Sequence, residues 1–213
     1  MVETAPKSTV LPLGTDMLER LPDHILRPVY DRSRLTPGIV HIGVGNFHRA
    51  HQAWYLHRLM QLGEAHDWAI IGAGVRSYDA AMREKLRGQD CLTTLIELDP
   101  SGMSAEVTGA MIDYLPIEDG NGALVAQMAN PAIRIVALTV TEGGYYIDPA
   151  TGAFDVNHPD IVHDAAHPET PRTAFGAMIA ALRQRRDAGQ RAFSALSGDI
   201  LLSYGIVLRL TVV

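Results

Sequence analysis

Uninterrupted apolar runs constrain the fold of this chain more than any other feature. The clearest run is IRIVALTV at residues 133–140, and shorter runs lie at residues 39–42 and 68–71. A strand that lacks alternating polar residues is typical of a sheet covered on both faces, which is the usual environment of parallel strands. The sequence therefore predicts buried strands at these three positions.

Helical patterns alternate with these runs. Apolar residues recur at helical spacing over residues 47–62 and again over residues 173–188. Shorter helices are predicted at residues 77–86 and 122–128, and further strands at residues 91–98, 106–115 and 192–196. Strands that alternate with helices predict an α/β fold: a Rossmann-like, mostly parallel sheet with helices on both faces.

The composition excludes several classes of protein. The net charge is -6 over 213 residues and no basic block occurs, so we expect no nucleic-acid partner and no anionic membrane partner. No apolar run has the length of a membrane span, and the first residues lack the pattern of a secretory signal. Cys91 is the single cysteine, which fits a reducing compartment. We expect a cytoplasmic protein.

The stretch GVGNFHRAH follows the first buried strand, at the position of a nucleotide-binding turn. In a dinucleotide-binding unit, a glycine turn between strand and helix lets backbone N–H groups approach a pyrophosphate. Gly43 and Gly45 fit this role, but His48 stands where the usual third glycine would be. On spacing alone, a turn without a ligand is an equally good interpretation.

Asp79 lies just beyond the second buried strand, where such units carry an acidic residue. Its carboxylate can accept hydrogen bonds from ribose hydroxyls and repel a 2′-phosphate, which favours NAD over NADP. Arg76, three residues earlier, could instead bind that phosphate. A charge at a helix N-terminus is the alternative interpretation of Asp79.

The strongest predicted strand runs into Thr141, Glu142 and two glycines. Ligands of open α/β sheets lie outside the carboxyl ends of the strands, so a carboxylate here can orient a substrate or transfer protons. A glycine turn with a solvated glutamate is the alternative. From Glu142 to about Pro171 the chain is rich in Gly, Asp, Asn, His and Pro, and we expect a long loop.

Two histidine pairs have the spacing of one helical face: His48 with His51, and His163 with His167. Zinc catalysis usually uses a third protein ligand, and neither pair has the glutamate of an H-E-x-x-H motif. The second pair also lies in the stretch expected to be a loop. We therefore expect no metal site.

Three arginines lie near the end of the last predicted helix: Arg183, Arg185 and Arg186. Positive charge suits the C-terminal end of a helix dipole, and a glycine follows that can terminate the helix. We expect all three side chains to be solvated.

Four stretches together resemble the polyol-specific long-chain dehydrogenases, the mannitol dehydrogenase family. They are GIVHIGVGNFHRAHQAW, WAIIGAGVRSYD, IRIVALTVTEGGYYID and HPETPRTAFGAMIAALRQRRDAG, and they cover about residues 37–191. The glycine turn that runs into FHRAH is itself a feature of this family. The resemblance implies a pyrophosphate turn formed by Gly43, Gly45, Asn46, Phe47, His48 and Arg49. It also implies Asp79 at the adenosine ribose, Thr141 near the nicotinamide, and Glu142 at the active site with a part in proton release.

The resemblance also implies the reaction. Such enzymes use NAD and no metal, and they oxidise a secondary alcohol of a sugar alcohol to a ketone; mannitol and arabinitol are the first candidates. Their base is a lysine on a separate helical domain, which is apt where the site lowers the lysine pKa. This chain contains only Lys7 and Lys85, neither in a matching motif, and Ile200 occupies the place of an active-site asparagine.

The resemblance divides the chain into three parts. Residues 1–36 are an N-terminal arm, residues 37–200 an NAD-binding Rossmann-like domain, and residues 201–213 the start of a connection to a C-terminal substrate domain outside this sequence. It implies the NAD-binding portion of a polyol dehydrogenase that is inactive alone. A non-catalytic nucleotide-binding or regulatory module is the alternative, which Ile200 favours.

Overall fold

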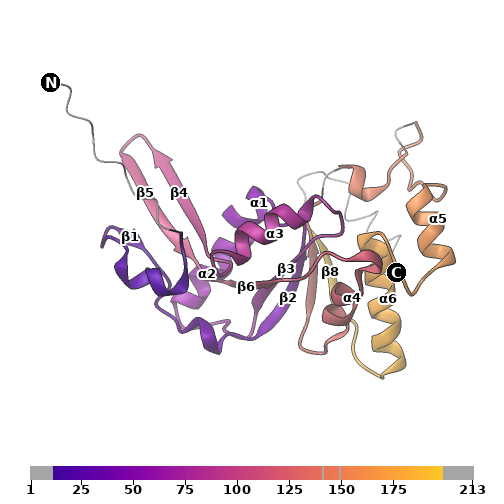
Figure 1. The fold of residues 1–213 in the computed structure, drawn as a ribbon, viewed down its shortest axis with the longest axis horizontal. Helices are drawn as coiled ribbons and strands as arrows, with labels where there is room; N and C mark the ends of the chain where they lie inside the picture. The colour runs from indigo at the N-terminus through magenta and orange to yellow at the C-terminus, as the bar shows by residue number, and fades with distance from the viewer. Residues whose placement is uncertain (1–11, 141, 149, 199–213) are drawn as a thin grey trace.

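A computed structural model describes residues 12–198 of the chain, except Thr141 and Pro149. Its main sheet has five parallel strands in the order β6-β3-β2-β7-β8. The strands are β2 (Pro37–Ile42), β3 (Ala69–Ala73), β6 (Met111–Tyr114), β7 (Ile135–Leu138) and β8 (Ser194–Ser197). The prediction of a Rossmann-like α/β fold is confirmed (Figure 1).

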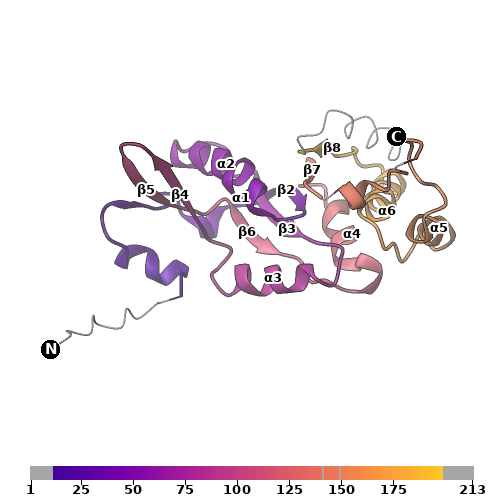
Figure 2. The same ribbon diagram turned by 90° about the horizontal axis from the view of Figure 1, so that it is seen from above.

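Helices cover both faces of this sheet (Figure 2). They are α1 (Asn46–Ala50), α2 (Gln52–Gln61), α3 (Asp79–Arg87), α4 (Gly122–Ala129), α5 (Pro159–Ala166) and α6 (Ala174–Asp187). Val40 and Ile42 of β2 pack with residues of α4 and α6, whereas Ile39 packs with residues of α2 and α3. Burial on both faces explains why these strands lack polar alternation. None of the described helices is long and apolar enough to cross a membrane.

A second, three-stranded sheet lies at one end of the molecule, opposite α5 (Figures 1 and 2). It consists of β1 (Ile25–Leu26), β4 (Thr93–Asp99) and β5 (Gly102–Thr108), where β4 and β5 form an antiparallel hairpin and β1 runs parallel to β5. The N-terminal segment thus contributes a strand. Its other elements are the 3-10 helices Thr15–Arg20 and Arg32–Arg34. Pro22 and Pro28 lie between them, and prolines at this density do not allow a long helix.

Three sequence predictions about elements are wrong. The strand expected at residues 106–115 is two strands in different sheets, because the chain bends at Gly109 against the side chains of Pro28 and Arg32. The helix expected at residues 47–62 breaks at His51, whose φ is -120° and ψ -85°. The expected long loop contains α5, because Pro159 lies in the first turn, where a proline is tolerated, and the ring of His158 caps that turn.

Arg185 is buried, so the expectation of a solvated side chain is wrong for this residue. Its side chain donates hydrogen bonds to backbone carbonyls at the end of α4 and before β7 and β8: those of Met128 (2.8 Å), Ile133 (2.6 Å), Arg191 (2.8 Å) and Asn130. Arg183 and Arg186 are exposed, as expected. One guanidinium therefore fastens α6 to α4 and to the start of two strands.

Candidate functional site

A cavity of about 580 Å³ opens at the carboxyl edge of the parallel sheet. Its walls come from the segments that follow β2, β3 and β7. The connections leave β2 and β7 toward opposite sides of the sheet, and this reversal in strand order is where open α/β sheets bind their ligands. The candidate site therefore lies at the expected edge.

Gly43 forms the first part of the wall, and only glycine fits there. Its φ is +91°, and a Cβ atom would lie 2.2 Å from the carbonyl oxygen of Thr139. The Thr139 hydroxyl donates a 2.7 Å hydrogen bond to the Gly43 carbonyl, which fixes the turn against the end of β7. The glycine thus allows two strand ends to meet.

Gly45 differs, because no described residue requires it to be glycine. Its φ of -87° is ordinary, and an added Cβ would meet no atom of residues 12–198, the two gaps aside, within 4 Å. Gly143, in the segment after β7, likewise meets no atom of the described residues. Bare backbone at two places in the lining of a cavity suits a ligand that lies directly against the chain.

Two stacked histidines, His41 and His48, are linked to the glycine turn through Thr139. The rings of His41 and His48 lie 3.5 Å apart at 20°. His41 Nε2 donates to Thr139 Oγ1 (2.8 Å), because that hydroxyl already donates to Gly43, and His48 Nδ1 donates to Gln52 Oε1 (3.0 Å). The remaining nitrogen of each ring is buried without a hydrogen-bond partner among the described residues. Both histidines are therefore neutral.

This pair makes the stability of the protein depend on pH. Burial lowers the pKa of His48 to about 4, and burial followed by the charge of a protonated His48 lowers that of His41. Since the unfolded chain binds these protons first, stability is lost as the pH falls below the ordinary histidine pKa of about 6.5. We expect His48 to remove about 2 kcal/mol between about pH 7 and pH 5.

Urea unfolding of the wild type and His48→Phe at these two pH values measures that loss. The variant should lose less stability on acidification than the wild type. His51→Phe is the control, because His51 is exposed one turn away and its replacement should leave the pH dependence unchanged. Equal pH dependence in the wild type and His48→Phe would contradict the prediction.

Asp79 lines the cavity and also closes the turn after β3. Its Oδ2 accepts hydrogen bonds from the backbone N–H groups of Val75 and Arg76, both at 3.0 Å. Gly74 permits this arrangement, since a Cβ there would lie 2.4 Å from the same oxygen. Asp79 is also the first residue of α3, so the helix-terminus interpretation holds. Its Oδ1 makes no hydrogen bond with the described residues, which leaves it for a ligand.

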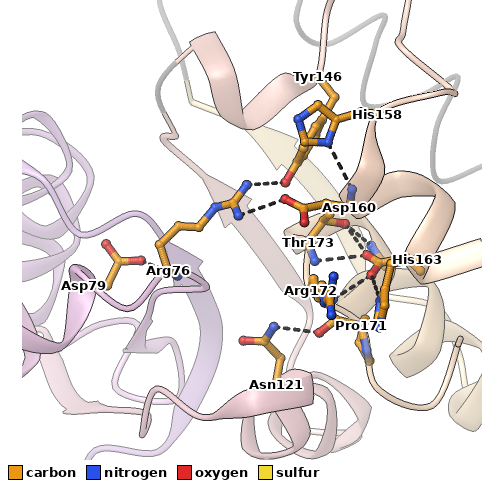
Figure 3. A network of polar contacts seen from close by, with 12 residues as sticks. Arg76, Asp79, Asn121, Tyr146, His158, Asp160, His163, Pro171, Arg172 and Thr173 are labelled. Carbon is orange, nitrogen blue, oxygen red and sulfur yellow. Dashed lines mark hydrogen bonds and ion pairs between the residues drawn. The ribbon is translucent and has the colours of Figure 1, made fainter.

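Arg76 reaches across the site, away from Asp79 (Figure 3). Its guanidinium pairs with the Asp160 carboxylate at 3.0 Å and donates to the Tyr146 hydroxyl at 2.6 Å. Burial raises the pKa of Tyr146 to about 12, so the hydroxyl accepts this bond as a neutral group. The three side chains come from the turn after β3, the segment after β7 and α5.

The residues of the predicted site do not all meet at the cavity. Gly43, Gly45 and Asp79 line it, whereas the side chains of the remaining turn residues, Asn46, Phe47, His48 and Arg49, do not. Asn46 and Arg49 contact each other, and Phe47 packs on His51. Of the six residues of the predicted pyrophosphate turn, Gly43 and Gly45 are therefore the ones that line the cavity.

Two residues beyond β7 were expected at the site, Thr141 and Glu142. Thr141 and the side chain of Glu142 lie outside the described residues; the backbone of Glu142 begins the 3-10 helix Glu142–Tyr145.

The second histidine pair lies on α5, where the rings of His163 and His167 are 4.8 Å apart. Across residues 12–198, with the two gaps noted above, no three His, Cys, Asp or Glu side chains gather as a metal site.

Sequence reasoning missed Thr139, His41, Tyr146 and Asp160. A histidine inside an otherwise apolar strand was a signal for His41, because a buried imidazole needs a partner. Asp160 carried no such signal, since its importance depends on a contact 84 residues away along the chain.

The chain is similar to known proteins over most of its length. A family model described as the mannitol dehydrogenase Rossmann domain matches residues 37–213. Mannitol 2-dehydrogenase of Cereibacter sphaeroides is 64% identical over 89% of this chain and 39% of the relative. Polyol:NADP oxidoreductase of Gluconobacter oxydans is 45% identical over 91% of this chain and 40% of the relative. The chain therefore spans about two fifths of the length of these relatives.

A solved structure is also similar to this chain over most of the chain's length. The ternary complex of Pseudomonas fluorescens mannitol 2-dehydrogenase with NAD and D-mannitol superposes with a TM-score of 0.90 and 47% sequence identity. The similarity covers 95% of this chain and 41% of that one.

Proposed function

The chain belongs to the mannitol dehydrogenase family, and from that premise we propose that it is the NAD-binding part of an oxidoreductase. The whole enzyme would interconvert a sugar alcohol of the mannitol or arabinitol type and its ketose by hydride transfer. The observation that carries the proposal is the space beside Gly45 in the wall of the cavity, which the described part of the chain leaves open. A relative crystallised with NAD and D-mannitol supports the choice of cofactor and substrate class.

In this proposal each wall of the cavity has a role. The turn at residues 43–45 and the N–H groups that begin α1 hold the pyrophosphate, because the first N–H groups of a helix have no acceptor within it. Asp79 holds the adenosine ribose through Oδ1. Thr141 and Glu142 would lie toward the nicotinamide. NAD, when bound, supplies the hydride acceptor, and Glu142 would help the proton to leave.

We further propose that the 213 residues bind NAD without oxidising a polyol. The family resemblance implies a lysine base, and Lys85 lines the cavity on the same side as Asp79, at the ribose end. A group there is remote from the alcohol that reacts. Incubation of the chain with NAD and D-mannitol or D-arabinitol tests this, since NADH formation above background would contradict it.

Replacing Gly45 by valine tests the cofactor site itself. The added atoms enter open space, so the free energy of unfolding should change by less than about 0.5 kcal/mol. The same atoms would occupy the place of the pyrophosphate, so we expect NADH to bind at least about tenfold more weakly. Titration of NADH fluorescence with the chain measures the affinity, and thermal unfolding measures the stability.

Ala153→Val is a suitable control, because Ala153 is exposed and does not line the cavity. It should bind NADH as the wild type does. Unchanged NADH affinity in Gly45→Val would show that the cofactor lies elsewhere.

A further inference from the structure

Three side chains form a clasp beside the cavity: Arg76 and Tyr146, which line it, and Asp160, which does not (Figure 3). Arg76 Nη1 pairs with Asp160 Oδ2 at 3.0 Å, and Nη2 donates to the Tyr146 hydroxyl at 2.6 Å. The guanidinium carbon also lies 5.9 Å from the centre of the Tyr146 ring. Two donors on one planar group are thus used at once, which fixes its direction.

The clasp is better shielded than an ordinary surface ion pair. Tyr146 is 5% exposed, so its hydroxyl has a fixed place, and the side chain of Asp160 is 20% exposed. Asp160 also lies in the first turn of α5, where a negative charge is favoured by the helix dipole. Partial burial weakens solvent screening and strengthens the pairing.

Arg76 lies close in sequence to the predicted ribose ligand Asp79, at a position where an arginine could bind a 2′-phosphate. In dinucleotide-binding folds, an arginine near the acidic ribose ligand accommodates the 2′-phosphate of NADP. Arg76 is three residues before Asp79, and its own backbone N–H donates to the Asp79 carboxylate. Its side chain nevertheless points the other way, and its charge is balanced by Asp160 (Figure 3).

The other charges at the cavity do not replace this cation. Among the described residues that line it, the charged side chains are Arg76, Asp79 and Lys85. Lys85 and Asp79 are on the same helix and carry opposite charges, so together they add no net charge to the cavity. A phosphate at the ribose would therefore need Arg76 to leave Asp160, and it would face two carboxylates.

We propose that Asp160, together with Tyr146, sets a preference of this chain for NAD over NADP by holding the Arg76 guanidinium away from the ribose 2′ position. The inference rests on the proposed function, because it needs the dinucleotide in this cavity. Membership of the family leaves the choice open, since one relative is named as an NADP oxidoreductase and another was crystallised with NAD. Asp160 acts here as a positioning residue.

Asp160→Asn tests the proposal, since it removes the charge and keeps the shape of the side chain. The released guanidinium can pair with a 2′-phosphate, so we expect NADPH to bind about tenfold more tightly. NADH affinity should stay within about twofold, because its ribose carries no phosphate. Tyr146→Phe should shift the ratio of the two affinities in the same direction, but less. Adenosine 2′,5′-bisphosphate and 5′-AMP, measured by calorimetry, should repeat the difference without the nicotinamide.

Two further variants test whether the release of Arg76 causes the gain in NADPH affinity. In Arg76→Met/Asp160→Asn the gain for NADPH should vanish, because Arg76 carries it. Asp67→Asn is the matched control: it breaks the Arg134 ion pair of 2.8 Å between the segments that precede β3 and β7, at the edge of the sheet opposite the cavity. It makes the same change in net charge and should leave both affinities unchanged.

Three results would overturn the proposal. The first is equal affinity changes for NADH and NADPH in Asp160→Asn, and the second is a gain that persists without Arg76. In both, wild-type binding of NADH leaves the proposed function intact. The third is a wild-type chain that binds neither NADH nor 5′-AMP, which would overturn the proposed function and this inference with it.

Discussion

Replacing Arg185 by methionine is expected to lower the free energy of unfolding by about 4 kcal/mol, a large fraction of the stability of a domain. The guanidinium donates to four backbone carbonyls, from Met128, Asn130, Ile133 and Arg191. Methionine fills similar space but donates nothing, so the carbonyls of Met128, Ile133 and Arg191 lose this donor in a site that is only 3% exposed at the arginine, while that of Asn130 keeps the Ile133 N–H. Urea unfolding followed by circular dichroism measures the loss.

Arg183→Met is the matched control, since it lies on the exposed side of the same helix and should change stability by less than about 0.5 kcal/mol. Arg185→Lys should recover little, because one ammonium group cannot reach four acceptors that a planar fork serves at once. If Arg185→Met were as stable as Arg183→Met, the carbonyls would have other donors. The claim that the Arg185 guanidinium holds α6 to α4 would then be wrong.

The buried strands could be predicted because their signal is local. The three central strands β2, β3 and β7 are covered on both faces, so apolar residues at residues 39–42, 68–71 and 133–140 mark them directly. The bend at Gly109 was not predictable in this way. There the apolar pattern continues while the chain passes from one sheet to the other, and the cause is a contact with Arg32, 77 residues earlier.

In the candidate site, too, some features could be predicted from the sequence and others could not. Gly43, Gly45 and Asp79 follow strands at fixed short distances, so their positions at one sheet edge follow from the topology. The direction of a long side chain does not follow from topology. From the sequence, Arg76 was an alternative ligand for a 2′-phosphate, whereas the observed direction of its side chain depends on contacts with Tyr146 and Asp160, 70 and 84 residues later in the chain.

Replacing Gly43 by alanine is expected to lower both the free energy of unfolding and the affinity for NADH. Two costs combine: a left-handed backbone with φ of +91°, and a Cβ placed 2.2 Å from the Thr139 carbonyl oxygen. Left-handed backbone costs an alanine about 1 kcal/mol, and the collision with backbone that cannot rotate away adds a similar or larger amount. We expect a total loss of about 3 kcal/mol in the free energy of unfolding.

Gly63→Ala separates the two costs, because Gly63 has a similar φ of +86° but an added Cβ there would have no described atom within 4 Å. It should lose only about 1 kcal/mol, and it should bind NADH normally because it does not line the cavity. Gly43→Ala should bind NADH at least about a hundredfold more weakly even at temperatures where it is folded, since relief of the collision must move the turn off the end of β7. Equal losses in the two variants would mean that the turn yields without strain, and the close meeting of β2 and β7 would then not be what holds the cofactor wall in place.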